Sequence, residues 1–163
     1  MILDVITDPN LILHKVAALI SAADLKSGKH KKLIADMTDT MYKKDGVGIA
    51  AVQVDVSYQI CIIAKEHTPD KKKDLVLVNP VWKKTSLKTA WDAEGCLSVP
   101  GIFGEVKRYK QITVEALNEN GDIIKFKAKD FFARIVQHEV DNLNGHLFIE
   151  KAKNLHESDR QAI

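Results

Sequence analysis

The sequence has little cysteine, no long apolar run and no excess of one charge. Its 2 cysteines are too few for a disulfide scaffold, so we expect reduced thiols and a cytoplasmic location. No run approaches the roughly 18 apolar residues of a membrane-spanning helix, and residues 1–10 lack the cationic start of a signal peptide. Lysine and arginine (24) nearly balance aspartate and glutamate (22), so we expect neither membrane association nor direct nucleic-acid binding.

The chain has the length and composition of one globular domain. It has 163 residues, of which 45% are hydrophobic and 28% are charged. A chain of this length can bury enough surface to fold without a disulfide or a metal. We therefore predict a single domain over residues 1–163.

Periodicity and turn signals predict a mixed fold. Helices are predicted at residues 11–23, 29–44 and 130–144. Strands are predicted at residues 60–64, 75–78, 112–116 and 123–127. The dipeptide Asn120-Gly121 is a hairpin signal between the last two of these strands. The prediction is an α+β fold with mainly antiparallel sheets.

The last predicted helix carries polar groups on a face that begins apolar. We expect Asp130 to cap its N-terminus and Gly145 to end it. One face of the helix carries, in order, Phe131, Ile135, His138, Glu139 and Asn142. Burying the three polar members costs free energy unless they form hydrogen bonds or hold a metal. A histidine satisfied within the core is the alternative to a ligand.

The segment His138-Glu139-Val140-Asp141-Asn142 is one residue short of the H-E-x-x-H motif. In that motif two histidines one turn apart bind a metal, and the glutamate accepts a proton from the metal-bound water. Because Asn142 replaces the second histidine, this segment alone is weak evidence of a metal site.

A catalytic metal site needs a third protein ligand, and a cysteine can supply one. Cys96 lies in Glu94-Gly95-Cys96-Leu97-Ser98, where the glycine and the following turn predict an exposed loop or strand end. A small buried apolar residue is the alternative reading of Cys96. Cys61, within a predicted strand, is expected to be such a core residue.

A third segment, GVGIAAVQ at residues 46–53, is rich in small residues. It follows a predicted helix, which is the wrong order for a phosphate-binding loop. We interpret it as a tight loop that lets backbone approach a ligand and brings Gln53 into a site, where its amide donors suit a developing oxyanion. A plain structural turn is the alternative.

Together these three segments resemble the three signature motifs of the bacterial peptide deformylase family. Residues 46–53 match G-x-G-[LI]-A-A-x-Q, residues 94–98 match E-G-C-L-S, and residues 137–141 match Q-H-E-x-D-H up to its final position. The order and separation of the motifs also fit. The resemblance implies mainly antiparallel sheets around a central C-terminal helix that bears the ligands.

The resemblance also implies a chemistry: hydrolytic removal of the formyl group from formyl-methionyl nascent polypeptides, with release of formate. One divalent metal ion is implied, Fe²⁺ by expectation, with Zn²⁺, Ni²⁺ or Co²⁺ as substitutes. Its ligands would be Cys96 and His138, with Asn142 at the third position. Glu139 would be the general base, and the Gln53 amide and the Leu97 backbone N–H would stabilise the oxyanion.

Further residues carry over from the family. Arg108 and Asp141 match an ion pair that braces the ligand helix, for which an ordinary surface pair is the alternative. Residues implied to bind the substrate are Val47, Gly48, Ile49, Gly95, Phe131 and Ile135. The implied partners are formyl-Met nascent peptides, with contact at the ribosome left open, and we expect a monomer.

Asn142 is the departure from the family pattern. An amide oxygen is a hard, neutral donor, whereas imidazole nitrogen suits Fe²⁺ or Zn²⁺. Asn142 could ligate weakly and sustain low activity, the chain could be a variant that folds but works poorly, or His146 could substitute. Rescue by His146 is the least favoured, because Gly145 should end the helix before it.

We therefore predict a metal-dependent deformylase whose activity Asn142 reduces. The alternative is an inactive deformylase-like module that binds N-terminal Met peptides. The presence of Glu139, Gln53 and Cys96 favours the enzyme. A purely structural metal pair, Cys96 with His138, would not explain the adjacent glutamate.

Overall fold

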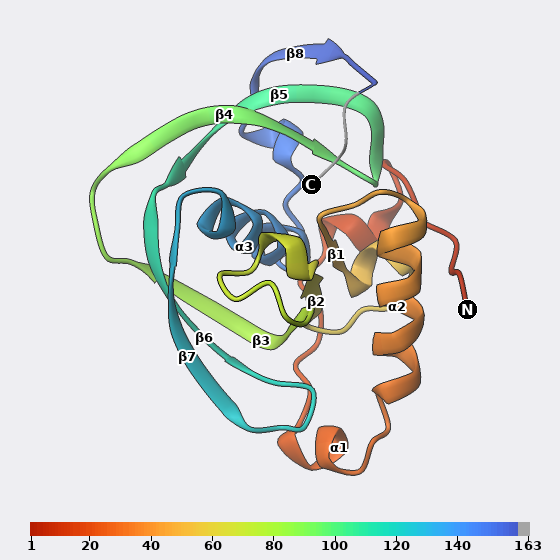
Figure 1. The fold of residues 1–163 in the computed structure, drawn as a ribbon. Helices are drawn as coiled ribbons and strands as arrows, with labels where there is room; N and C mark the ends of the chain where they lie inside the picture. Colours follow the sequence, from red (N-terminus) through yellow and green to blue (C-terminus); the bar gives the residue numbers. More distant parts are fainter. Residues whose placement is uncertain (160–163) are drawn as a thin grey trace.

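A computed structural model describes residues 1–159, and it places one helix between two sheets (Figure 1). The central helix is α3 (Asp130–Leu143). Helix α2 (Lys31–Lys43) lies at the right-hand side of the molecule in this view. Every pair of neighbouring strands in the described part of the chain is antiparallel. The prediction of an α+β fold with mainly antiparallel sheets is therefore confirmed.

The larger sheet has five strands in the order β1-β2-β3-β6-β7. Its strands are β1 (Gly48–Ala50), β2 (Ile60–Ile63), β3 (Leu75–Lys84), β6 (Gln111–Leu117) and β7 (Ile123–Lys129). Strands β6 and β7 form the predicted hairpin, and Gly121 takes a left-handed conformation (φ +82°) in its turn. Ile112, Val114 and Ala116 alternate with less buried residues, so one face of β6 packs towards the core.

The smaller sheet has three strands in the order β4-β5-β8. Its strands are β4 (Thr89–Cys96), β5 (Val99–Tyr109) and β8 (Lys153–Glu157). This sheet was not predicted, because β4 carries Asp92 and Glu94 and lacks an apolar alternation. In Figure 1 it lies above α3, and its strand β4 ends at Cys96.

The prediction of a helix over residues 11–23 was wrong. The structure instead has a 3-10 helix at Leu11–His14 and a short helix α1 (Ala22–Lys26), with extended chain between them. Backbone groups in this segment form hydrogen bonds with distant parts of the chain. The N–H of Ala17 donates to the Leu143 carbonyl (2.9 Å), and the N–H of Ala18 donates to the Ser57 carbonyl (3.0 Å). These long-range bonds override the local preference for a helix.

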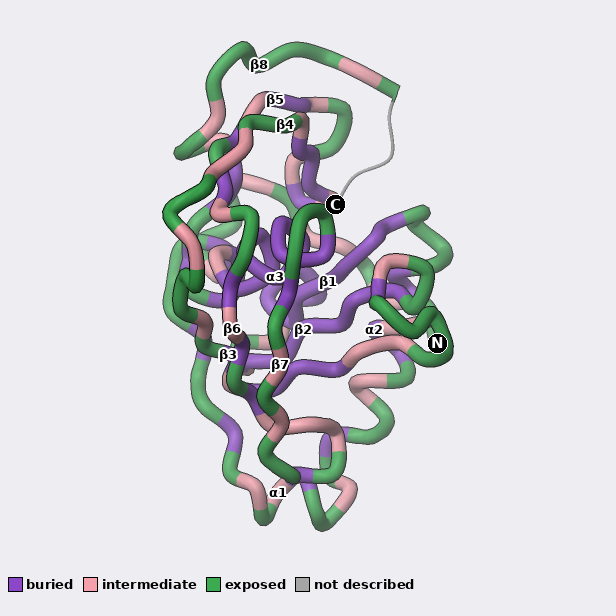
Figure 2. Tube along the Cα trace, turned by 60° about the vertical axis from the view of Figure 1, so that its left-hand side comes forward, coloured by how far each residue is buried: buried purple, intermediate pink, exposed green. Residues whose placement is uncertain are grey.

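Helix α3 is buried along almost its whole length (Figure 2). Its apolar side chains, including Val136 and Leu143, belong to the main hydrophobic core. Gly145 ends it as predicted, in a left-handed conformation (φ +81°). Asp130 is the first helical residue rather than the cap, and its carboxylate lies 3.5 Å from Lys110 Nζ, so that detail of the prediction was wrong.

Within residues 1–159, none of the helices has the length and apolar character needed to cross a membrane.

Candidate active site

Three elements bring the predicted site residues together. Cys96 lies at the end of β4, His138, Glu139 and Asn142 lie on α3, and Gln53 lies in a 3-10 helix at Ala51–Val54. The Gln53 amide Nε2 donates to Cys96 Sγ (3.4 Å), and Asn142 Nδ2 lies 4.0 Å from the same sulfur. Residues from the three sequence motifs therefore meet around one thiol.

Cys96 is buried at a strand end, although the sequence predicted an exposed loop or strand end. Only 1% of its surface is accessible. The pairing register of β4 with β5 shifts between Gly95 and Cys96. A β-carbon at Gly95 would lie 2.4 Å from the Phe103 ring. A glycine at this position therefore allows the ring to pack against the strand next to Cys96. The strand-end position was predicted correctly, and the exposure was not.

His138 is oriented by Glu94. The distance between His138 Nδ1 and Glu94 Oε1 is 2.8 Å, so the ring donates its Nδ1–H to the carboxylate. Burial by itself would lower the pKa of His138, but Cys96 and Glu94 outweigh it and raise the pKa to about 10. The same negative field favours a cation beside Nε2, which is buried and lies next to the Cys96 thiol.

Glu139 is fully buried next to His138. Among the described residues neither of its carboxylate oxygens has a hydrogen-bond partner, and burial raises its pKa to about 7. A β-carbon at Gly48 would lie 2.5 Å from Glu139 Oε1, so the glycine makes room for the carboxylate. The expected loop over residues 46–53 is in fact strand β1 followed by a 3-10 helix.

These side chains fit a bound cation. His138 Nε2, Asn142 Oδ1 and both Glu139 oxygens are buried polar atoms, three of them oxygen acceptors, that form no close hydrogen bond within residues 1–159, and the Cys96 sulfur lies 4.0 Å from Asn142 Nδ2. A cation satisfies several such acceptors at once, whereas leaving them unpaired is costly. No group of three His, Cys, Asp or Glu residues able to hold a metal occurs in the described chain.

Glu94 is a functional residue that the sequence reasoning missed. Both its oxygens accept hydrogen bonds from Arg108, at 2.9 and 3.0 Å, and Arg134 donates to Oε2 (2.7 Å). Burial by itself would raise the pKa of Glu94, but His138 and Arg108 hold it well below its usual range. Glu94 lies two residues before Cys96 in the same strand, so a β4 assignment would have placed both side chains on one face.

Arg108 also forms an ion pair with Asp141 on α3. Its side chain is only 5% accessible, so this is not an ordinary surface pair. The contact joins β5 to the turn of α3 that carries His138 and Asn142. The geometry favours the brace over the surface-pair reading.

The residues expected to bind substrate do not line a single cavity. Val47, Ile49 and Ile135 are buried in the hydrophobic core. Phe131 is 42% accessible and packs edge-on against the His67 ring, although it was expected at the start of a buried face. Phe131 and Arg134 line a smaller pocket of about 170 Å³.

A larger cleft opens beside Cys96. Its volume is about 680 Å³, and its walls come from the N-terminal segment, the end of α2 and the turn between β4 and β5. Its lining includes Thr7, Lys44, Cys96, Leu97 and Ile102. The cleft gives the buried thiol its opening to solvent.

His146 does not join this site. It is exposed, and its Nδ1 lies 3.1 Å from Glu150 Oε2. Rescue of the missing ligand by His146 is therefore excluded in this conformation.

An α+β domain in which a His-Glu pair on a buried helix faces a cysteine at a strand end has the arrangement of a metal-dependent hydrolase. Comparison with known families agrees: the sequence profile described as Polypeptide deformylase matches residues 2–158. The chain belongs to this family.

Relatives and solved structures support the assignment over most of the chain. A peptide deformylase of Neisseria meningitidis is 40% identical over 154 residues, covering 94% of this chain and 89% of the relative. Peptide deformylase 1 of Burkholderia multivorans is 38% identical over 159 residues, covering 96% and 84%. A class I type b peptide deformylase from Acinetobacter baumannii, solved with Met-Ala-Ser bound, has a TM-score of 0.85 and 38% identity, covering 93% of this chain and 98% of that one.

Proposed function

We propose that this chain is a metal-dependent hydrolase that removes the formyl group from formyl-methionyl nascent polypeptides and releases formate. The observation that carries the proposal is His138: its Nδ1–H is held by Glu94, while its buried Nε2 lies in the same site as the Cys96 thiol and Glu139. Membership of the deformylase family supplies the reaction.

Cys96, His138 and Asn142 would hold the metal, with Fe²⁺ as the proposed ion and Zn²⁺, Ni²⁺ or Co²⁺ as substitutes. When bound, a divalent cation supplies positive charge that acidifies water and polarises a carbonyl oxygen. The Asn142 amide can be turned by 180°, which exchanges Oδ1 with Nδ2 and directs the oxygen towards the Cys96 sulfur. An amide oxygen is a weaker donor to these ions than imidazole, so we propose reduced metal affinity.

Glu139 would act as the general base. It follows His138 in the chain, and its carboxylate is buried in the same site. A buried carboxylate in this position can accept a proton from the attacking water and pass it to the leaving amine.

Gln53 and the Leu97 backbone N–H would stabilise the negative charge that develops on the formyl oxygen. The Gln53 carbonyl Oε1 accepts a hydrogen bond from the Ala50 N–H (2.8 Å), which fixes the direction of its amide donors. Fixed donors contribute more than mobile ones because they need no reorganisation during the reaction.

The substrate would enter through the cleft beside Cys96. The Acinetobacter baumannii relative was solved with the peptide Met-Ala-Ser, which supports a peptide substrate here. The roles predicted for Val47, Gly48, Ile49, Gly95, Phe131 and Ile135 in binding the methionine end of the peptide stay predictions, because none of these residues lines the cleft.

We also propose that the chain works as a cytoplasmic monomer on peptides emerging from the ribosome, without contacting nucleic acid itself. Both cysteines are unpaired and buried, which suits a reducing compartment. Sedimentation velocity tests the monomer, and cosedimentation with ribosomes before and after ribonuclease treatment tests the contact.

The test of the activity is formate release from formyl-Met-Ala-Ser by protein loaded with Ni²⁺ or Fe²⁺, with metal content assayed in the same samples. We expect turnover, and we expect Glu139→Gln to keep its metal while losing about 10²–10⁴-fold in rate. No turnover at full metal occupancy would overturn the hydrolase and leave a module that only binds N-terminal Met peptides. Full activity in Glu139→Gln would remove Glu139 from the role of base.

A further inference from the structure

Arg134 is a buried cation that the proposed mechanism does not use. It lies on α3 one turn before His138 and is 4% accessible. One guanidinium nitrogen donates to Glu94 Oε2 (2.7 Å) and to the Val106 carbonyl (2.8 Å), and the other donates to the Ala90 carbonyl (2.9 Å).

Arg134 completes the hydrogen bonding of Glu94. Oε1 of Glu94 accepts from His138 Nδ1 and from Arg108, and Oε2 accepts from Arg108 and from Arg134. An ionised carboxylate has about four acceptor positions, so all of them are occupied. A carboxylate held on both oxygens cannot rotate, which fixes the orientation of the His138 ring.

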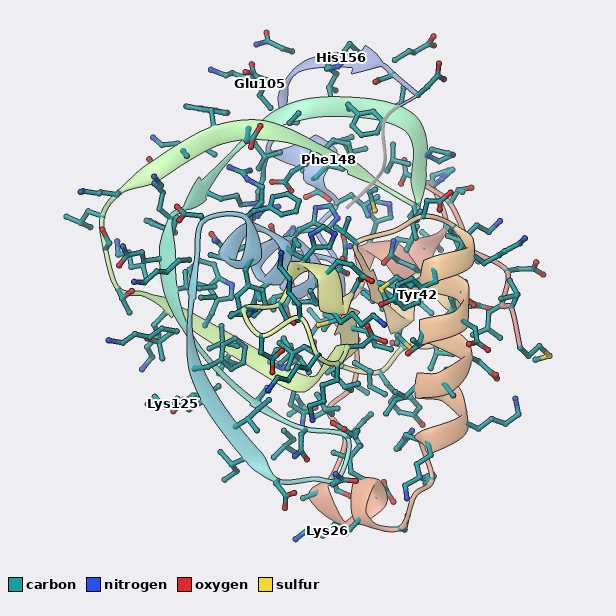
Figure 3. All side chains as sticks on the ribbon, in the orientation of Figure 1. Lys26, Tyr42, Glu105, Lys125, Phe148 and His156 are labelled. Carbon is teal, nitrogen blue, oxygen red and sulfur yellow. The ribbon has the colours of Figure 1, made fainter. Side chains whose placement is uncertain are left out.

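Arg134 also connects the elements that carry the two strongest ligands. Ala90 lies on β4, the strand that ends in Cys96, and Val106 lies on β5, while Arg134 itself belongs to the helix of His138. The Phe148 ring packs beside the His138 ring, with centroids 6.2 Å apart, and shares a cluster with Cys96 (Figure 3 labels Phe148 above α3). Arg134 thus adds polar contacts between the sheet that carries Cys96 and the helix that carries His138.

We infer that Arg134 is a positioning residue, which orients His138 through Glu94 and sets the spacing between Cys96 and His138. This inference rests on the metal site of the proposed function. The competing explanation is that Arg134 is only a buried ion pair, which an apolar residue of similar volume could replace without effect on the site.

The test compares Arg134→Met and Arg134→Lys with a matched control, Gln137→Met. Gln137 also ties α3 to β5, since its Nε2 donates to the Tyr109 carbonyl (2.8 Å) and its Oε1 accepts from the Tyr109 N–H (3.0 Å), but it does not touch Glu94. Zn²⁺ affinity is measured by competition with a chromophoric chelator. The thiolate-to-Co²⁺ charge-transfer band reports on coordination, and chemical unfolding reports on the fold.

We expect Arg134→Met to lose about 10–100-fold in Zn²⁺ affinity and to change the Co²⁺ spectrum. Arg134→Lys should recover part of the affinity, because it keeps a charge near Glu94 but cannot make the forked contact. Gln137→Met should lose stability and stay within about threefold of the unmodified affinity, as expected for a contact outside the Glu94 network. Unchanged affinity in Arg134→Met, or an equal loss in Gln137→Met, would overturn the inference.

Two provisions keep the test decisive. If Arg134→Met does not fold, the Zn²⁺ affinity of Arg134→Lys is compared with that of the unmodified chain, and equal affinities overturn the inference.

The same variants are also made in a chain that carries Asn142→His. If neither the unmodified chain nor the Asn142→His chain binds Zn²⁺, the inference is overturned as well. Failure of the proposed function looks different: the unmodified protein then binds metal, with the same dependence on Arg134, but releases no formate.

Discussion

Asn142 is the residue that decides how well this site can work. Its amide lies beside the Cys96 sulfur, and its Oδ1 has no partner among the described residues. The surrounding residues are in place: Glu94 orients His138, and Gly48 makes room for Glu139. The departure from the family motif is therefore confined to Asn142.

Replacing Asn142 with histidine should strengthen the site. We expect Asn142→His to raise Zn²⁺ affinity at least about tenfold, because imidazole is a better donor to this ion than an amide oxygen, and to raise the rate of formate release. Isothermal titration and a formate assay on the same preparation measure both effects. The matched control is Asn142→Ala, which should bind more weakly than the unmodified chain; if neither substitution changes affinity, position 142 does not face the metal.

The site residues could be predicted from the sequence where they fall in short motifs. Cys96, His138, Glu139 and Gln53 come from three such motifs, and the structure brings all four together. Glu94 lay inside a motif, yet its role was missed because its partners come from β5 and from an earlier turn of α3. A hydrogen bond between residues 44 positions apart leaves no trace in local sequence.

Helix α3 shows why some elements are predictable. Its apolar periodicity and the Gly145 stop are local signals, and they place the helix to within a residue at each end. The failed helix over residues 11–23 had similar apolar residues, but Ala17 and Ala18 bond to distant backbone instead. Strand β4 was missed because it holds charged residues on the face that meets Arg108.

The Arg108 brace gives a prediction for the contact between β5 and α3. Arg108→Met should lower the free energy of unfolding by about 3–5 kcal/mol, because it leaves the buried Glu94 and the partly buried Asp141 without one of their cations. The control is Lys151→Met, since Lys151 pairs with the same Asp141 carboxylate but is 45% accessible. Its loss should cost less than about 1 kcal/mol in urea unfolding. Equal effects for the two variants would contradict the brace.

The whole domain is built to fold without its metal. Its main core joins α3 to the five-stranded sheet, and a second core joins α2 to β1 and β2. Neither of these two cores contains Cys96. We therefore expect both cores to pack whether or not a metal is bound. The expectation, drawn from chain length alone, that no metal is needed for folding stays a prediction.

Removing the metal should therefore leave a folded protein. After treatment with a chelator, we expect an unchanged far-UV circular dichroism spectrum and a cooperative unfolding transition at a lower midpoint, because a ligand that binds only the native state stabilises it. Zinc added back should restore the midpoint in a concentration-dependent way. Loss of secondary structure on chelation would show that the metal is needed for the fold.

The central claim is that side chains from β4 and α3 hold one divalent cation in this chain despite Asn142. The direct measurement is metal content per chain after equilibrium dialysis against micromolar Zn²⁺, for the unmodified protein, Cys96→Ala and His138→Ala. The account predicts close to one zinc in the unmodified protein and little in either variant. Full occupancy in both variants, or none in the unmodified protein, would contradict it.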